Sequence, residues 1–293
     1  MASNSSKIIE RKQIRLNESQ EKMIISGWGR DVIENTIVEK ITYLSDGLKV
    51  KGYIGYPTEQ SKKYSCIIWN RGGYGNKGAI DSFTARGVYG QIASWGYVVL
   101  ATQYRGNDGG DGKDEFGGED VNDVLNLVPL AEELEFADKD KWGIEGWSRG
   151  GMMTYLSLTR NHNPAYPAGG FKCAIVLGGI ANLRCSSDES PFMRRLYEAT
   201  LGKYKDEEFY EKCDSRSIVK FADKLPSNTP LLLMHGTNDD RVLPHDSLDL
   251  SYKLLEYKIP FRLIMLEGGD HFMKKHRKEV DELRKMWYEK YLK

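Results

Sequence analysis

The pentapeptide Gly146-Trp147-Ser148-Arg149-Gly150 follows an apolar stretch, 141–146, and opens a segment with helical spacing, 149–159. A G-x-S-x-G sequence between a strand and a helix is typical of a sharp turn that exposes a serine nucleophile. Small residues are needed there, because the serine backbone is strained and packs closely on the next helix. The N-terminus of that helix directs unpaired N–H groups toward the serine. This stretch predicts a serine enzyme built on strands that alternate with helices.

Strands and helices do alternate on both sides of this pentapeptide. Strands are expected at 64–70, 97–103, 141–146, 171–178, 231–235 and 261–266, and helices at 81–94, 119–134, 149–159, 246–257 and 272–291. Pro129 is expected to kink or split the second helix. Residues 37–44 and 48–56 alternate like strands around a Ser-Asp-Gly turn, which predicts an antiparallel hairpin. The pattern predicts an α/β fold, with a mostly parallel sheet covered by helices on both faces.

The chain is expected to divide into an N-terminal extension, 1–36, and an α/β domain, 37–293. The extension is polar, and only a short helix near 18–25 is expected in it. The segment 181–228 interrupts the alternation with charged, helix-prone sequence, and helices are expected at 193–201 and 206–213. We expect a helical cap there, over the carboxyl edge of the sheet where open α/β sheets bind ligands. Apolar side chains lie beside arginines in this cap: Phe192, Met193, Leu196 and Tyr197 with Arg184, Arg194 and Arg195. They predict a pocket of modest size, apolar with a few polar anchors.

Composition excludes several classes of protein. The 293 residues include 42 Lys and Arg against 42 Asp and Glu, a balance that argues against a nucleic-acid binder. No apolar run approaches the ~20 residues of a membrane span, and the N-terminus lacks the apolar core of a signal peptide. The four cysteines form no CxxC pair, which predicts free thiols in a reducing compartment. We therefore expect a cytoplasmic protein that acts on a small molecule or a short peptide.

A serine hydroxyl becomes an effective nucleophile when a histidine accepts its proton and an acid orients that histidine. His271 follows the last expected strand through a glycine-rich turn, which can bring its imidazole over the sheet edge. The acid should follow the preceding strand, where Asp239 and Asp240 are adjacent. Spacing does not separate these two acids.

An acyl-transfer site also needs donors for the oxyanion that forms during attack. One is expected to be the backbone N–H of Arg149, and a second should come from the loop Arg71-Gly72-Gly73-Tyr74 after strand 64–70. Arg71, Tyr74 and Trp147 are candidate substrate contacts. The chain has no HExxH sequence, no His/Cys cluster at ligand spacing and no P-loop, so no metal and no cofactor are expected.

From about Val38 to the C-terminus, the chain resembles the catalytic domain of the prolyl oligopeptidase family, within the α/β-hydrolase superfamily. The matching stretches are Gly-Trp-Ser-Arg-Gly-Gly at 146–151, His-Gly-Thr-Asn-Asp-Asp-Arg-Val at 235–242, Gly-Asp-His at 269–271 and Tyr-Arg-Gly at 104–106. In the family's H-G-x-x-D-x-x-V pattern the acid is the Asp three residues before Val. The resemblance therefore implies an α/β-hydrolase fold and a triad of Ser148, Asp239 and His271.

Two departures from the family pattern change what can be carried over. Family members usually have an N-terminal β-propeller that screens substrates by size, whereas about 36 residues precede the hairpin here. Substrate selection is then expected to fall to the cap and the neighbouring loops. The family also has His or Tyr before the Gly-Gly pair, and in some branches that tyrosine hydroxyl binds the oxyanion. Arg71 stands there in this chain. Its guanidinium could serve as a donor, but the resemblance carries over the backbone N–H of Gly73 more directly as the second donor.

These features together predict a serine hydrolase that forms an acyl-enzyme on small peptide or amide substrates. A carboxylesterase is the near alternative, because the same triad serves both kinds of bond. A non-catalytic receptor with this fold is the alternative of another class. A complete and correctly ordered triad argues against the receptor, because binding alone needs neither the acid nor the strained serine turn.

Overall fold

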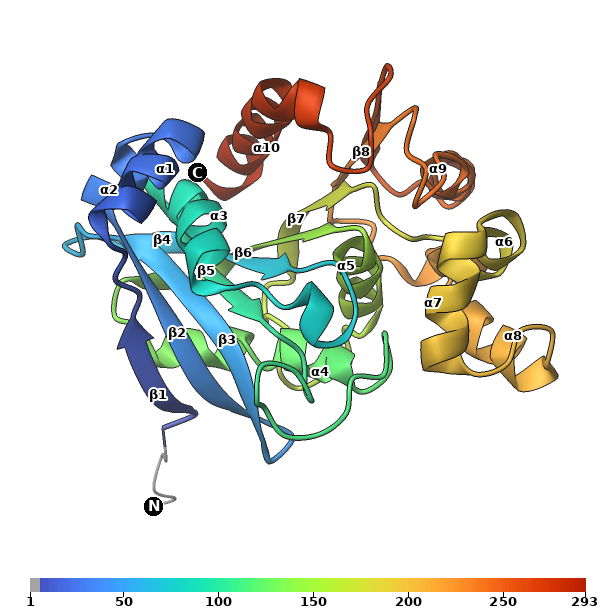
Figure 1. The fold of residues 1–293 in the computed structure, drawn as a ribbon, viewed down its shortest axis with the longest axis horizontal. Coiled ribbons are helices and arrows are strands. Elements are labelled where there is room, and N and C mark those ends of the chain that lie inside the picture. Colours follow the sequence, from blue (N-terminus) through green and yellow to red (C-terminus); the bar gives the residue numbers. More distant parts are fainter. Residues whose placement is uncertain (1–5) are drawn as a thin grey trace.

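A computed structural model describes residues 6–293, whose strands form one mixed sheet (Figure 1). The strands are β1 (Ile8–Gln13), β2 (Thr36–Ser45), β3 (Leu48–Pro57), β4 (Tyr64–Asn70), β5 (Val98–Thr102), β6 (Ala137–Trp147), β7 (Phe171–Leu177), β8 (Leu231–Gly236) and β9 (Phe261–Leu266). Their spatial order is β1-β2-β3-β5-β4-β6-β7-β8-β9. The pairs from β1 to β5 are antiparallel, and all later pairs are parallel. The predicted α/β fold, with its antiparallel hairpin before a parallel sheet, is confirmed.

Helices cover both faces of this sheet. They are α1 (Glu18–Trp28), α2 (Asp31–Glu34), α3 (Ser82–Ser94), α4 (Asp120–Leu125), α5 (Arg149–Thr159), α6 (Leu183–Glu189), α7 (Pro191–Leu201), α8 (Glu207–Asp214), α9 (His245–Glu256) and α10 (Arg277–Leu292). Tyr89 of α3 and Trp287 of α10 pack into the core on one face. Val124 of α4, Met153 of α5 and Leu250 of α9 pack into the core on the other. The molecule is therefore a three-layer sandwich.

Burial explains which strands could be predicted from the sequence. Every residue of β4 and β8 is buried, which matches the continuous apolar runs of strands covered on both faces. In β1 only Ile8 is buried, because this strand lies at the edge of the sheet. Its sequence, IIERKQ, therefore lacks a strand pattern, and the sequence analysis assigned no strand there.

Local sequence explains where several helices begin. Asn17 and Gln20 form a reciprocal capping box at the start of α1. Pro129 opens a separate 3₁₀ turn, η2 (Val128–Glu133), so the helix expected over 119–134 is split there. The closing helix begins at Arg277 rather than at 272, because Met273 has φ 50° and a 3₁₀ turn, η5 (Lys274–His276), intervenes. The residues just after His271 therefore form a loop.

The segment between β7 and β8 folds into α6, α7 and α8, which group together away from the sheet (Figure 1). The helices expected at 193–201 and 206–213 are present as α7 and α8, whereas α6 was not expected. Asp246 of α9 anchors the start of this segment, because its carboxylate accepts the N–H groups of Ala181 (2.5 Å) and Asn182 (2.7 Å). The hydroxyl of Ser186 donates to the same carboxylate at 2.9 Å.

Candidate active site

Ser148 lies where β6 ends and α5 begins. Its backbone has φ 57° and ψ −122°, a conformation that costs a non-glycine residue about 1–3 kcal/mol. A Cβ atom at Gly146 would lie 2.0 Å from the carbonyl oxygen of Gly150, and one at Gly150 would lie 2.0 Å from that of Asn70. Both glycines are therefore required by the close approach of the chain. The predicted strand–turn–helix is present and exposes Ser148 at the carboxyl edge of the sheet.

His271 and Asp239 form a buried hydrogen bond, with 2.7 Å between Nδ1 and Oδ2. They lie in the loops after β9 and β8, which are neighbouring parallel strands and therefore end at the same edge of the sheet. The other carboxylate oxygen of Asp239 accepts the backbone N–H groups of Arg241 (2.9 Å) and Val242 (3.0 Å). Asp240 is exposed. Of the two adjacent acids, Asp239 is the one that contacts His271.

His235, at the end of β8, lies on the inner side of this pair. Its Nε2 atom is 3.3 Å from Oδ2 of Asp239 and 2.9 Å from the carbonyl oxygen of Val242, and its Nδ1 atom is 2.7 Å from the hydroxyl of Ser247. Burial alone would raise the pKa of Asp239, but the hydrogen bonds of His235 and His271 lower that pKa below its ordinary value. Asp239 is therefore an anion at neutral pH. His235 is the histidine that opens the H-G-x-x-D-x-x-V pattern, and its contact with Asp239 was not predicted.

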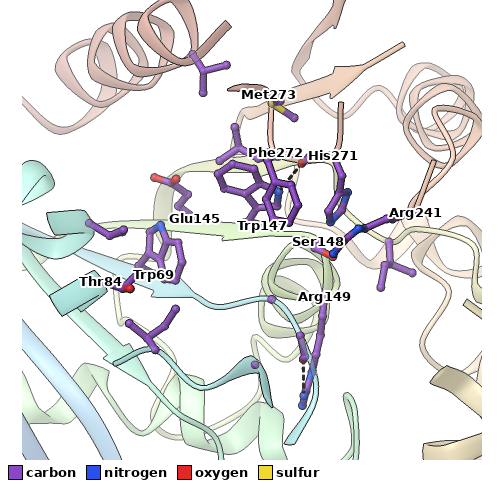
Figure 2. Close-up of a pocket in the computed structure, with 18 of the residues that line it drawn as sticks. Trp69, Thr84, Glu145, Trp147, Ser148, Arg149, Arg241, His271, Phe272 and Met273 are labelled. Carbon is purple, nitrogen blue, oxygen red and sulfur yellow. Dashed lines mark hydrogen bonds between the residues drawn. The ribbon is translucent and has the colours of Figure 1, made fainter. Parts of the chain in front are cut away.

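Trp147 and Phe272 hold the loop that carries His271. The indole N–H of Trp147 donates to the carbonyl oxygen of His271 at 3.0 Å, the bond drawn as a dashed line in Figure 2. The ring of Phe272 packs edgewise against the imidazole, with 5.5 Å between ring centroids, and it also packs against Trp147 at 6.3 Å. Trp147 thus steadies the histidine loop, in addition to lining the cavity described below.

The start of α5 and the glycine loop after β4 both lie next to Ser148. Arg149 is the first residue of α5, so its N–H has no partner within the helix. The glycine loop passes next to the serine, because a Cβ at Gly72 would lie 3.3 Å from the Cβ of Ser148. Gly73 has φ 70°, and a Cβ there would lie 2.7 Å from the Cα of Gly78, so glycine is required at this position. The structure thus places the glycine loop beside the serine, at the start of α5.

Arg71 lies beneath this loop and does not line the cavity, so its expected contact with substrate is wrong. Its guanidinium donates to the carbonyl oxygen of Gln103 at 2.7 and 3.2 Å and to that of Gly72 at 3.0 Å. Burial and the charge of Arg149 lower the pKa of Arg71 to about 10. The C=O and N–H of a trans peptide point in opposite directions. By holding the carbonyl of Gly72, Arg71 therefore directs the N–H of Gly73 away from itself.

The side chain of Arg149 forms a buried ion-pair network that the sequence analysis did not predict. It donates to Asp114 at 2.6 and 2.9 Å, to Asp120 at 2.6 Å, and to the carbonyl oxygen of Gly73 at 3.1 Å. Burial would raise the pKa of Asp114, but Arg149 lowers it to about 2. The network ties the start of α5 to the glycine loop and to the long loop after β5. In the sequence, the acidic residues Asp114, in that loop, and Asp120, at the start of α4, indicate that a buried cation could be paired there.

Ser148 and His271 open into one cavity of about 1060 Å³ (Figure 2). Tyr74 and Trp147 line this cavity, as the sequence analysis expected of substrate contacts. The exposed guanidinium of Arg241 stacks on Phe272 at 4.8 Å from the ring centroid, and it also lines the cavity. Arg241 lies two residues after Asp239, and its contribution to the cavity was not predicted.

The cap contributes part of this cavity wall through α7. Phe192, Met193 and Leu196 line the cavity, whereas Tyr197 is fully buried in the core. The cap arginines do not line it: Arg184 pairs with Asp214, Arg194 donates to backbone carbonyls of α6, and Arg195 makes no part of the lining. The cap wall of the cavity is therefore apolar.

Two further features concern metals and membranes. Residues 6–293 contain no group of three or more His, Cys, Asp or Glu side chains that could hold a metal ion. Within the same range, no helix combines the length and apolar character that crossing a bilayer requires.

Comparisons with known proteins agree on one family. A sequence model described as the prolyl oligopeptidase family matches residues 86–293. The chain is 31% identical over 249 residues to the Bacillus subtilis protein named uncharacterized peptidase YtmA, covering 83% of this chain and 90% of that protein. It is 26% identical over 251 residues to dipeptidyl-peptidase 5 of Aspergillus oryzae, covering 81% of this chain and 33% of that protein.

Among solved structures, the acylaminoacyl peptidase of Pyrococcus horikoshii superposes with a TM-score of 0.73 and 21% sequence identity. The match covers 97% of this chain and 45% of that one. The chain therefore spans nearly all of YtmA, about a third of the dipeptidyl-peptidase and less than half of the acylaminoacyl peptidase. The likeness to the solved structure shows the shared fold.

Proposed function

Because the chain belongs to the prolyl oligopeptidase family of serine peptidases, we propose that Ser148, His271 and Asp239 form its catalytic triad. The observation that carries this proposal is the 2.7 Å bond between His271 and Asp239, in the same cavity onto which the strained turn at Ser148 opens. The roles follow from the chemistry of each group. Asp239, kept ionised, holds the proton of His271 on Nδ1, which leaves Nε2 free to accept the proton of Ser148.

In the proposed reaction, Oγ of Ser148 attacks the carbonyl carbon of the scissile bond while His271 takes the hydroxyl proton. The bond from that carbon to the leaving nitrogen then breaks, and His271 donates the proton to the departing amine. The acyl group remains on Ser148 as an ester. Water attacks this ester with His271 again as base, the acid product leaves, and Ser148 regains its proton.

The oxyanion of each tetrahedral intermediate is proposed to be bound by the N–H groups of Arg149 and Gly73. Such donors stabilise charge only when they are held in position before the reaction. The ion pairs of Arg149 and the bond from Arg71 to the carbonyl of Gly72 supply that rigidity. Arg71 is in this account a positioning residue and not a donor to substrate.

We also propose that residues 37–293 form the hydrolase domain, to whose sheet β1 of the N-terminal extension adds an edge strand, and that 181–228 act as a cap that limits substrate size. The support is the apolar wall from Phe192, Met193 and Leu196 in a cavity of about 1060 Å³, which suits a short peptide or a small ester. A folded protein chain would not enter it. The names of the relatives, which are peptidases, favour the amide bond over the ester.

A substrate panel tests this proposal. We expect hydrolysis of aminoacyl- and Ala-Pro-p-nitroanilides, and a loss of about 10⁶-fold in kcat in the matched Ser148→Ala variant. Cleavage of p-nitrophenyl acetate, butyrate and octanoate without any anilide cleavage would instead indicate a carboxylesterase. Wild-type protein that cleaves neither class above the Ser148→Ala background would contradict the hydrolase assignment. EDTA should leave the rates unchanged, because every proposed role belongs to a protein group.

A further inference from the structure

The cavity continues past Trp147 into a second chamber, on the other side of that indole from Ser148. Figure 2 shows Trp69, Thr84 and Glu145 on this far side. The chamber lies between α1, α3 and α10, whereas α7 of the cap lies on the other side of β6 (Figure 1). Its apolar lining is Trp28, Trp69, Val88, Trp147, Met273 and Val280.

The two carboxylates of this chamber, Glu145 and Asp281, are already paired with neighbouring groups. Glu145 is 2.8 Å from the Nε atom of Arg284 and accepts the hydroxyl of Tyr288. Asp281 is 2.7 Å from Arg284 and accepts the side-chain amide of Gln91 at 2.9 Å. A charged group entering beside these carboxylates would therefore displace an existing partner or remain unpaired, which is costly in a buried place. The lining favours an uncharged apolar or aromatic guest.

The chamber lies on the side of the reaction from which the leaving group departs. Phe272 and Met273 follow His271 directly in the chain and line the cavity, and Trp147, at its entrance, bonds to the backbone of His271. His271 is the group that must protonate the departing amine, so this amine has to remain next to His271. Substituents on that amine are then closest to the chamber, whereas the acyl group is left to the cap wall.

Much of the chamber wall comes from outside the matched family region. Trp28, Trp69 and Thr84 precede residue 86, where the match to the family model begins. Trp28 belongs to α1, in the N-terminal extension, and its ring lies against the backbone of α3, because a Cβ at Gly87 would lie 2.7 Å from it. Arg277, which is exposed and also lines the cavity, stacks on the same indole at 4.7 Å from its centroid. Helix α1 thus closes one side of the chamber through Trp28.

We propose that this chamber is a leaving-group subsite, which binds an uncharged apolar or aromatic side chain on the amine side of the scissile bond. The proposal rests on the proposed function of Ser148 and His271. It places the acyl group of their substrate at the cap wall and the amine side in the chamber. It gives the N-terminal helix a part in substrate selection through Trp28.

Partitioning of one acyl-enzyme between water and added amines tests the subsite without changing the acyl group. p-Nitrophenyl butyrate supplies the butyryl-enzyme, and L-phenylalaninamide or glycinamide is then added as a competing nucleophile. The amine nitrogen forms a bond to the acyl carbon, the bond from that carbon to Ser148 breaks, and His271 transfers the amine proton to the serine oxygen. By microscopic reversibility, the amine must bind where a leaving amine binds. Mass spectrometry measures the amide formed against the butyrate released.

We expect phenylalaninamide to capture the acyl group about tenfold or more better than glycinamide, the size expected for burying one aromatic side chain. Val88→Trp, which fills the chamber from α3, should reduce this preference to about twofold. Trp28→Ala, which removes part of the wall, should also reduce it. Leu255→Trp is the matched control, because Leu255 is 64% exposed on α9 and does not line the cavity. This control should keep the wild-type preference.

Equal capture of both amines by the wild type, or an unchanged preference in both Val88→Trp and Trp28→Ala, would overturn the subsite. A preference for glutamate or lysine amides would overturn the apolar assignment. If no acyl-enzyme forms at all, the proposed function fails, and the subsite is then tested by calorimetry with N-acetyl-L-phenylalaninamide on Ser148→Ala protein. Saturable binding that weakens more than tenfold in Ser148→Ala/Val88→Trp supports the subsite, and binding of equal strength, or none, contradicts it.

Discussion

The reaction centre and the cavity walls of this protein are built in different ways. Ser148, Asp239 and His271 each lie within a few residues of the end of a parallel strand, and parallel strands end at one edge of the sheet. The walls come instead from helices spread over the whole chain: α1, α3, α7 and α10. The chemistry is thus specified by short local stretches, whereas the shape that would select a substrate depends on how distant helices dock.

The side chains of the reaction centre and those of the cavity walls also differ in how deeply they are buried. His271 and Asp239 are 6% and 3% exposed and are held by hydrogen bonds from several directions. Phe192 and Trp28, on the two walls, are exposed or half-buried and make mainly ring contacts. Substitutions at the reaction centre should therefore change rates by orders of magnitude, and substitutions in the walls should change preferences by small factors.

The largest effect is expected at Asp239. Asp239→Asn should lower kcat by about 10⁴-fold, because an amide no longer holds the proton of His271 on Nδ1. Asp240→Asn is the matched control one residue away, on an exposed side chain, and should stay within about twofold. Steady-state kinetics on the best anilide measure both. Equal losses in the two variants, or the reverse ranking, would show that the acid is wrongly assigned.

A smaller effect on kcat is expected when Arg71, which lies beneath the glycine loop, is replaced. Arg71→Met frees the carbonyl of Gly72 and should lower kcat by about 10²-fold with little change in KM, comparable to losing one oxyanion donor. Arg71→Lys, which keeps the charge but not the fork of donors, should fall between wild type and Arg71→Met. Thermal melting monitors whether the variants remain folded. A raised KM with unchanged kcat would mean that the guanidinium binds substrate directly.

The cap wall should change selectivity by less than tenfold. Met193→Ala enlarges the cavity from α7, and it should raise kcat/KM for p-nitrophenyl octanoate relative to acetate about fivefold. Val88→Trp, on the opposite wall, should leave this ratio unchanged. If Val88→Trp shifts the ratio and Met193→Ala does not, the acyl and leaving-group walls are assigned the wrong way round.

The smallest effect concerns stability and pH, and it contrasts two buried carboxyls. Burial raises the pKa of Asp246, which anchors the cap, to about 6, whereas its hydrogen bonds lower that of Asp239. Between the ordinary value and about 6, folding takes up a proton at Asp246, so its contribution to stability falls as pH rises through that window. For Asp239 the pH dependence has the opposite sign, because its contribution to the stability of the fold is lost as pH falls through its lowered pKa.

Asp246→Asn removes this dependence and keeps a carbonyl acceptor for the N–H groups at the start of the cap. From pH 4 to pH 7, the melting temperature of wild type should therefore fall on the order of 5 °C relative to that of Asp246→Asn. Differential scanning fluorimetry across this range measures the difference. A difference that is independent of pH, or that changes with the opposite sign, would contradict the raised pKa.

The same contrast explains how far the sequence could predict the molecule. Around Ser148, α5 has its predicted bounds and β6 ends within one residue of its prediction, because the buried end of this strand and the glycines beside the serine leave a strong local pattern. The start of β6 was predicted four residues too late, because residues 139–141 are polar and exposed. The choice of Asp239 over Asp240 needed the resemblance to a family, since adjacent acids have identical spacing signals. β1 and α6 were missed, because an exposed edge strand and a short polar helix carry no apolar period.

Other parts of the site depend on contacts that no local pattern records. Arg71 was expected to face the substrate, and it instead bonds to backbone carbonyls beneath the loop, 32 residues away in one case. The ion pairs of Arg149 join it to residues 29 and 35 positions earlier in the chain. The chamber walled by Trp28 requires α1 to dock on α3, which only the folded chain reveals.

Labelling with a fluorophosphonate probe tests the central claim most directly, because only a base-activated serine attacks phosphorus at a useful rate. Mass spectrometry of the digested protein should find one adduct per chain, on Ser148. The adduct should be absent from Ser148→Ala protein and should form more slowly on Asp239→Asn. No adduct on the folded wild type, or an adduct on another residue, would contradict the assignment of Ser148 as nucleophile.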